Sequence, residues 1–192
     1  MTYLMLGLVL FLGAHSVRIF ADDWRTQTLT RLGEGPWKGL YSLLSLLGLA
    51  LIAWGFDAAR ELPIVLWTPP PALRPVAIGL TVLSFVLLAA AYMPGNGIKS
   101  RLHHPMLLGV KVWALSHLLV NGMLSHVLLF GSFLLWSVLD FSSARRRDRR
   151  AGTVYAPGNL RATVLTCALG LVAWGVFAYG LHGLLMGIKP MG

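Results

Sequence analysis

Six long apolar runs constrain this chain more than any other feature of its sequence. They cover residues 2–20, 38–57, 75–94, 105–121, 123–140 and 162–187. A helix of about 20 residues crosses the hydrocarbon core of a bilayer, and lipid admits only helices or closed barrels as spanning structures. No strand-like alternation is present, and only 12% of the 192 residues are charged, about half the share in a soluble domain. The sequence therefore predicts an all-α polytopic membrane helix bundle, formed by residues 1–192 as one domain.

The fourth and fifth runs are two parts of one continuous apolar stretch, from Pro105 to Leu139, which is too long for a single span. Asn121 and Gly122 are the natural place to divide it, because both residues tolerate the positive φ of a tight turn. With this division the sequence predicts six transmembrane helices, so that the two ends of the chain lie on the same side of the membrane.

The basic residues predict the orientation of these helices. Most of the 16 Lys and Arg residues lie in the loops after the first, third and fifth runs: Arg18, Arg25, Arg31, Lys38, Lys99, Arg101, Arg145, Arg146, Arg147, Arg149, Arg150 and Arg161. Only Arg60, Arg74 and Lys189 lie on the other side. Because Lys and Arg concentrate in cytoplasmic loops, both termini are expected to be periplasmic. The net charge of +9 then reflects membrane topology and contact with lipid headgroups, and no nucleic-acid partner is expected.

Several classes of chemistry are excluded by what the sequence lacks. It has no Gly-rich phosphate loop, no GxSxG motif and no pair of carboxylates within an apolar run, so hydrolysis or acid-base chemistry by carboxylates is not expected. The single cysteine, Cys167, leaves no CxxCH motif for covalent haem attachment. Any haem bound by this chain would therefore be held by side chains alone.

Two histidines lie several residues inside apolar runs, and ionisable groups at membrane depth mark functional sites by default. Helical periodicity places His117 on one stripe with Trp113 and Asn121, and His15 on one stripe with residues that include Arg18. An apolar helix face with one imidazole is typical of a helix that lines a haem pocket, and two such helices supply two axial ligands. The other two histidines within apolar runs, His126 and His182, lie near the outer surface beside Ser125 and Tyr179. For these two we favour a structural role, in hydrogen bonds between helices.

Two further histidines, His103 and His104, lie at the cytoplasmic mouth of the fourth run. Thirteen residues separate His104 from His117, which corresponds to about 140° around a helix, so the two cannot face one iron. From the residues alone, a pair of His15 with His104 remains almost as good a ligand set as His15 with His117.

Three basic residues are candidates to neutralise haem propionates or an anionic substrate at the inner face: Arg18, Arg101 and Lys111. The alternative for Lys111 is that its ammonium group simply extends to the cytoplasmic membrane surface.

Two motifs carry a resemblance to a known family. FLGAHSVRIF near the start and RLHHPMLLGVKVWALSHLLVNG in the fourth run resemble the signature regions of the NnrU family of bacterial membrane proteins, which is related to the plant zeta-carotene isomerase. The resemblance implies a multi-pass protein of the bacterial inner membrane that binds haem b, with His15 and His117 as iron ligands. It places His104 at the family's HP histidine, with His103 as an additional neighbour.

The resemblance implies a link to denitrification and nitrogen-oxide metabolism, with lipid and proteins of that pathway as partners. The alternative that it implies is a haem-dependent cis-trans isomerase, which acts on a lipid-soluble, carotenoid-like polyene. RLHHP is also weakly similar to the S-adenosylmethionine site of membrane methyltransferases of the isoprenylcysteine type, but those enzymes carry an acidic pair near the C-terminus and nothing after Asp148 is acidic here. A purely structural membrane protein is the fourth hypothesis.

Overall fold

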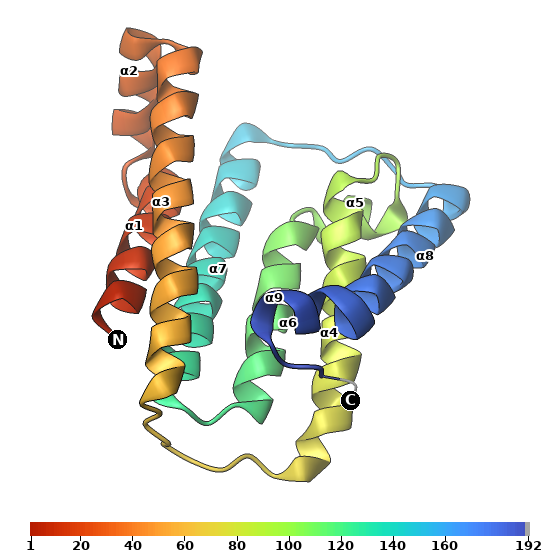
Figure 1. The fold of residues 1–192 in the computed structure, drawn as a ribbon. Helices are drawn as coiled ribbons and strands as arrows, with labels where there is room; N and C mark the ends of the chain where they lie inside the picture. Colours follow the sequence, from red (N-terminus) through yellow and green to blue (C-terminus); the bar gives the residue numbers. More distant parts are fainter. Residues whose placement is uncertain (191–192) are drawn as a thin grey trace.

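The computed structural model describes residues 1–190 and is built from helices (Figure 1). In chain order these are α1 (Thr2–Phe20), α2 (Asp22–Leu32), α3 (Glu34–Glu61), the 3-10 turn η1 (Pro71–Leu73), α4 (Arg74–Tyr92), α5 (Gly97–Leu102), α6 (Pro105–Val120), α7 (Leu124–Ala151), α8 (Leu160–Val176), the π-helical turn η2 (Phe177–Leu181) and α9 (His182–Met186). Within residues 1–190 the only β-structure consists of two isolated β-bridges, and no strand is formed. The prediction of an all-α fold is confirmed.

Five helical segments are long and apolar enough to cross a membrane. They are Thr2–Phe20, Glu34–Glu61, Pro71–Tyr92, Leu124–Ala151 and Leu160–Met186. The predicted fourth span corresponds to α6, which has only 16 residues and is about 24 Å long at 1.5 Å per residue. That length falls short of a hydrocarbon core of about 30 Å. The structure therefore supports five spans by length and composition, with α6 as a shorter apolar helix.

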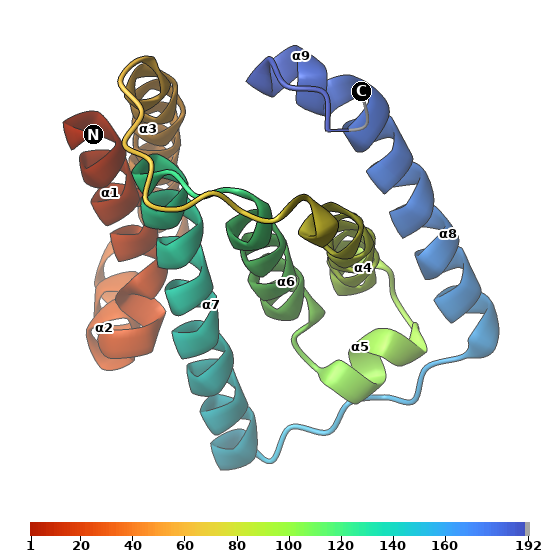
Figure 2. The same cartoon turned by 90° about the horizontal axis from the view of Figure 1, so that it is seen from below.

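The helices lie side by side in a curved row (Figure 2). The long helix α3 packs against α1, α1 against α7, α7 against α6, α6 against α4, and α4 against α8. The loops gather at the two ends of the helices (Figure 1). We call the end with α2, α5 and the charged last turns of α7 the basic end, and the opposite end, with residues 62–70 and 121–123, the Trp67 end.

Close backbone contact joins α1 to α3. A Cβ atom placed on Gly55 would lie 2.2 Å from the backbone nitrogen of Leu4, and one placed on Gly48 would lie 2.7 Å from that of Phe11. Small residues let transmembrane helices approach this closely, and the resulting van der Waals contact drives their association in lipid. The position of α1, and of every side chain it carries, therefore depends on these glycines of α3.

The predicted division of the long apolar stretch is confirmed, but the conformational reason was wrong. The α6 helix ends at Val120 and α7 begins at Leu124, while Asn121 is extended with a φ of −133° and Gly122 is not among the residues with positive φ. A Cβ atom on Gly122 would lie 1.8 Å from the carbonyl oxygen of Trp67, and the Gly122 carbonyl accepts hydrogen bonds from two backbone amides of that loop. Glycine is needed here for close approach of two loops.

Two Pro-Gly-Asn turns are joined at the basic end, a pairing that the sequence analysis missed. Asn96 and Asn159 each cap the helix that follows, α5 and α8, by accepting a backbone N–H bond at 2.8 and 2.7 Å. The Asn159 amide also donates to the carbonyl of Gly95 at 2.9 Å, and the Gly97 amide donates to the Thr163 hydroxyl at 2.8 Å. These bonds fix the start of α8 beside α5.

Candidate functional site

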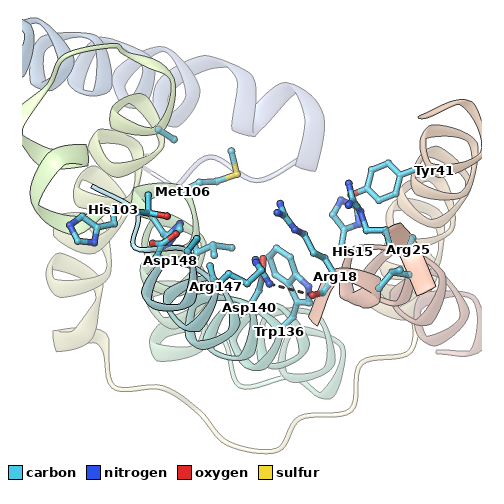
Figure 3. Close-up of a pocket in the computed structure, with 18 of the residues that line it drawn as sticks. His15, Arg18, Arg25, Tyr41, His103, Met106, Trp136, Asp140, Arg147 and Asp148 are labelled. Carbon is cyan, nitrogen blue, oxygen red and sulfur yellow. Dashed lines mark hydrogen bonds and ion pairs between the residues drawn. The ribbon is translucent and has the colours of Figure 1, made fainter. Parts of the chain in front are cut away.

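A cavity of about 900 Å³ opens at the basic end of the protein, within the size range of sites for small molecules and cofactors. Figure 3 shows its construction from three sides. The α1, α2 and α3 helices form one wall, α5 and the first turn of α6 form the other, and the basic-end half of α7 lies between them. The predicted ligand His15 and the alternative ligand His104 both line this cavity.

His15 stands where the cavity meets the packed interior. Its Nδ1 lies 2.7 Å from the carbonyl oxygen of Phe11, one helical turn earlier, so Nδ1 carries the proton in this bond and Nε2 is the basic nitrogen. The ring stacks on Phe11 at 4.2 Å between centroids, and it also contacts Tyr41 at 5.1 Å and the edge of Trp136 at 6.0 Å. An imidazole fixed in this way presents Nε2 as a potential iron ligand.

His117 has the same local arrangement on α6, but it does not line the cavity. Its Nδ1 lies 2.9 Å from the carbonyl oxygen of Trp113, again one turn earlier, and its ring stacks on Phe130 at 4.4 Å. The amide of Asn121 donates a hydrogen bond to the His117 carbonyl at 2.8 Å. Trp113 and Asn121 therefore support His117 from its own helix, as the predicted stripe implies.

An aromatic cluster of Phe11, Trp113, Phe130 and Phe133 links the two histidines. Phe133 of α7 contacts both Phe11 at 5.8 Å and Trp113 at 5.6 Å, the two residues whose carbonyls hold His15 and His117. The histidine rings are not themselves in contact. The sequences FLGAH and WALSH, which end at His15 and His117, share an aromatic residue four positions before the histidine and a small residue directly before it. This repetition was visible in the sequence and was missed.

His103 and His104 belong to a polar cluster that joins the start of α6 to the end of α7. His104 Nε2 lies 2.7 Å from a carboxylate oxygen of Asp148, and the Tyr155 hydroxyl donates to the same oxygen at 3.0 Å. The ring of His103 stacks on Tyr155 at 4.1 Å, and its Nδ1 accepts a hydrogen bond from Arg145 at 2.7 Å. Burial raises the pKa of Tyr155, and the hydrogen bond to Asp148 raises it further, so this hydroxyl remains a donor at neutral pH.

The three predicted propionate-binding residues are not brought together. Arg18 lines the cavity, and its Nε lies 3.8 Å from a carboxylate oxygen of Asp22. The Lys111 ammonium group lies 4.0 Å above the ring of Phe141, and neither Lys111 nor Arg101 lines the cavity. Of these three residues, only Arg18 shares a site with His15.

The histidines predicted to be structural differ from one another. The His182 Nδ1 lies 2.7 Å from the carbonyl oxygen of Ile188, which is a bond within the same C-terminal segment. His126 is buried with 8% exposure, packs against Phe56 at 5.1 Å, and has no hydrogen-bond partner for Nδ1 within residues 1–190. Neither residue makes the predicted hydrogen bond between spans. Residues 1–190 contain no group of three or more His, Cys, Asp or Glu side chains arranged to hold a metal ion.

Five helical segments that are long and apolar enough to cross a membrane identify the chain as an α-helical membrane protein. The model of one protein family, described as NnrU protein, matches residues 3–190. The chain therefore belongs to the NnrU family, and the resemblance noted in its two motifs is confirmed. A search of curated proteins finds no match, and a search of solved structures finds none either.

Proposed function

We propose that the protein binds haem b in the bacterial inner membrane through the Nε2 atoms of His15 and His117. The observation that carries this proposal is the shared arrangement of the two residues, each of which holds Nδ1 on a carbonyl of its own helix at 2.7 and 2.9 Å. Histidines that ligate metals almost always donate their second ring nitrogen in this way, which fixes the ring and makes the ligating nitrogen more basic. Aromatic rings contact both histidines, and they supply apolar surface of the kind on which a porphyrin face can pack.

The observed side-chain packing sets a condition for this ligand pair. His15 and His117 are linked through Phe11, Phe133 and Trp113, so a single iron between the two imidazoles requires these rings to move aside. The alternative partner, His104, lines the same cavity as His15, but Asp148 engages its Nε2 at 2.7 Å. Because the Nε2 of His117 has no such competitor within residues 1–190, where its bonds are made by Nδ1, we favour His117 as the second ligand.

A haem held by His15 and His117 would supply one-electron redox chemistry and an iron to which nitric oxide can bind. We accordingly propose a role in nitrogen-oxide metabolism or denitrification, as a sensor, redox carrier or assembly factor. The chain's own contribution would be to fix two imidazoles against aromatic rings, with Arg18 and Arg25 lining the same cavity as His15.

The visible absorption spectrum of the purified protein, with haem added in excess and then removed by gel filtration, tests the proposal. We expect about one haem per chain and a low-spin, six-coordinate spectrum in the oxidised state, because two neutral imidazoles give a strong ligand field. A protein that retains no haem, or retains only high-spin haem, would contradict the proposed ligand pair. Optical spectra of empty lipid nanodiscs treated in the same way are the control.

We also propose that α6 crosses the membrane with the other five segments, and that the basic end is cytoplasmic. The α6 helix packs between α4 and α7, and its neighbouring loop at Asn121–Met123 lies at the Trp67 end beside residues 64–67. A short helix can be accommodated by local thinning of the bilayer. The excess of Lys and Arg at the basic end then sets the orientation.

Reporter fusions test this topology. A fusion after Gly152 is expected to be active as a cytoplasmic reporter, whereas fusions in the loop at Gly122 and at the end of the chain are expected to be active as periplasmic reporters. The fusion at Gly122 discriminates six spans from five, because a non-spanning α6 leaves this loop on the cytoplasmic side. Activity of a cytoplasmic reporter fused at Gly122 would therefore contradict the six-span topology.

A further inference from the structure

The cavity at the basic end has an unequal distribution of charge. Its three carboxylates are each engaged: Glu34 by Lys38 at 2.6 Å, Asp140 by Arg147 at 3.5 Å, and Asp148 by His104 at 2.7 Å. Five Arg or Lys side chains line the cavity, one from each of α1, α2, α3, α5 and α7. In chain order they are Arg18, Arg25, Lys38, Lys99 and Arg147. Once these pairs are formed, the cavity keeps Arg and Lys side chains that no carboxylate of its lining pairs with.

Two of the remaining cations are arginines on the wall that carries His15. The Nε of Arg18 lies 3.8 Å from Asp22, and both side chains are largely exposed, so this contact is much longer than a charge-assisted hydrogen bond of about 2.8 Å. The guanidinium of Arg25 lies 5.9 Å from the ring centroid of Trp37, and it makes no ion pair within residues 1–190. Figure 3 shows Arg18 and Arg25 beside His15. Arginine is suited to carboxylate because its planar fork donates two parallel hydrogen bonds.

The rest of the lining is mixed, with apolar side chains next to the polar residues His15, Tyr41, His103, His104 and Thr153. Met106 and Leu107 line the wall opposite the arginines, and Ala144 lies on α7 between the walls. The indole Nε1 of Trp136, on the same stretch of α7, is buried and has no hydrogen-bond partner within residues 1–190. A buried unpaired donor of this kind costs free energy unless a ligand or water engages it. Within residues 1–190, the cavity thus combines apolar lining residues and one buried, unpaired N–H donor with arginines that have no strong ion pair.

We infer that the cavity binds the carboxylate end of an amphiphilic anion, with Arg18 and Arg25 as the carboxylate-binding residues. The charge goes to the two arginines, and the apolar body of the ligand lies against Trp136, whose ring contacts that of His15. Two sources supply this chemistry, the propionate groups of a porphyrin and the headgroup of a fatty acid. The porphyrin source rests on the proposed function, whereas the carboxylate site itself does not.

Binding of metal-free protoporphyrin IX to the full chain, in phosphatidylcholine nanodiscs, tests this inference. Protoporphyrin carries both propionates but no iron, so its affinity reports the carboxylate site independently of any histidine ligand. We expect the diacid to bind at least about tenfold more tightly than protoporphyrin dimethyl ester, and the double variant R18A/R25A to lose that difference, because each charged hydrogen bond accounts for about one factor of ten. Fluorescence titration measures both affinities.

Two control variants separate this effect from loss of fold and from a general effect of charge. R146A/R150A removes two exposed arginines from the same end of the protein, neither of which lines the cavity, and it should bind the diacid as the wild type does. R18K/R25K keeps the charge but loses the planar fork, so intermediate affinity is expected. Affinity for the dimethyl ester, which should be equal in all variants, reports that the cavity remains intact.

Competition with oleate then distinguishes the two sources. Displacement of protoporphyrin by oleate that depends on Arg18 and Arg25 supports a carboxylate site for a lipid chain, and no displacement supports the porphyrin as the ligand. Equal affinity of the diacid and the dimethyl ester in the wild type would overturn the inference, as would R18A/R25A binding the diacid like R146A/R150A. Failure of the haem proposal looks different, because the protein would then retain no haem, or only high-spin haem, while protoporphyrin still binds.

Discussion

Replacement of His117 by Gly is expected to abolish the low-spin haem spectrum completely, and replacement of His15 by Gly is expected to do the same. Each residue contributes one of the two proposed axial ligands, so the loss of either leaves at most five-coordinate, high-spin iron. That iron should bind carbon monoxide or nitric oxide, which a six-coordinate haem resists. Absorption spectra of the oxidised, reduced and carbon monoxide-treated variants measure all three states.

Free imidazole supplies the decisive control for this pair of variants. If the variant folds and only the ligand is missing, imidazole can enter the space left by the side chain and restore the low-spin spectrum. His182→Gly is the matched control, because the Nδ1 of His182 bonds to Ile188 within its own segment and His182 is not one of the proposed ligands. Retention of the low-spin spectrum in His117→Gly, together with its loss in His104→Gly, would assign the second ligand to the cavity and place the haem closer to the basic end.

The apolar runs predicted the main helices because a helix that crosses a bilayer needs apolar side chains along the whole part that contacts lipid. Predicted segments at 2–20, 75–94 and 105–121 differ by no more than two residues at either end from α1, α4 and α6. The α3 and α7 helices instead run well beyond the predicted limits of 38–57 and 123–140, to Glu34–Glu61 and Leu124–Ala151. Hydropathy locates the apolar part of a helix, whereas charged residues such as those after Asp140 have good helix propensity and continue it.

A polar helix was missed for the same reason. The α2 helix (Asp22–Leu32) has no buried residue and no apolar run, so hydropathy gives no sign of it. Its other signals were present in the sequence: Asp22 and Asp23 in the first turn, Arg31 in the last turn, and Gly33 directly after it. These are the acidic start, basic end and terminal glycine typical of a short surface helix.

The candidate site was predictable only to the extent that it depends on single helices. The stripe of His117 with Trp113 and Asn121 follows from helical periodicity, and the side-chain bonds along α6 agree with it. The engagement of His104 by Asp148 joins residues 44 positions apart, and the placement of Arg25 near His15 depends on how α2 folds beside α1. Such contacts depend on the rotation and packing of whole helices, which no local pattern specifies.

Substitution of Gly55 by Ala is expected to lower the free energy of unfolding by about 1–3 kcal/mol, the usual cost of overpacking a close interface. The added Cβ would lie 2.2 Å from the backbone nitrogen of Leu4. Backbone atoms cannot turn aside as a flexible side chain does, so α1 must move away from α3. Because the α1–α3 interface holds the helix that carries His15, haem retention should fall together with stability.

Gly39→Ala is the matched control for this substitution, since Gly39 lies in the same helix and an added Cβ meets nothing within 4 Å. It should leave stability unchanged or raise it by about 0.5–1 kcal/mol, because Ala restricts the unfolded chain more than Gly does. Gly48→Ala extends the test toward the site, since its Cβ would lie 2.7 Å from the backbone nitrogen of Phe11, whose carbonyl holds His15. Unfolding in mixed micelles with increasing dodecyl sulfate measures the three variants. Equal midpoints for Gly39→Ala and Gly55→Ala would mean that α1 and α3 do not pack as closely as described.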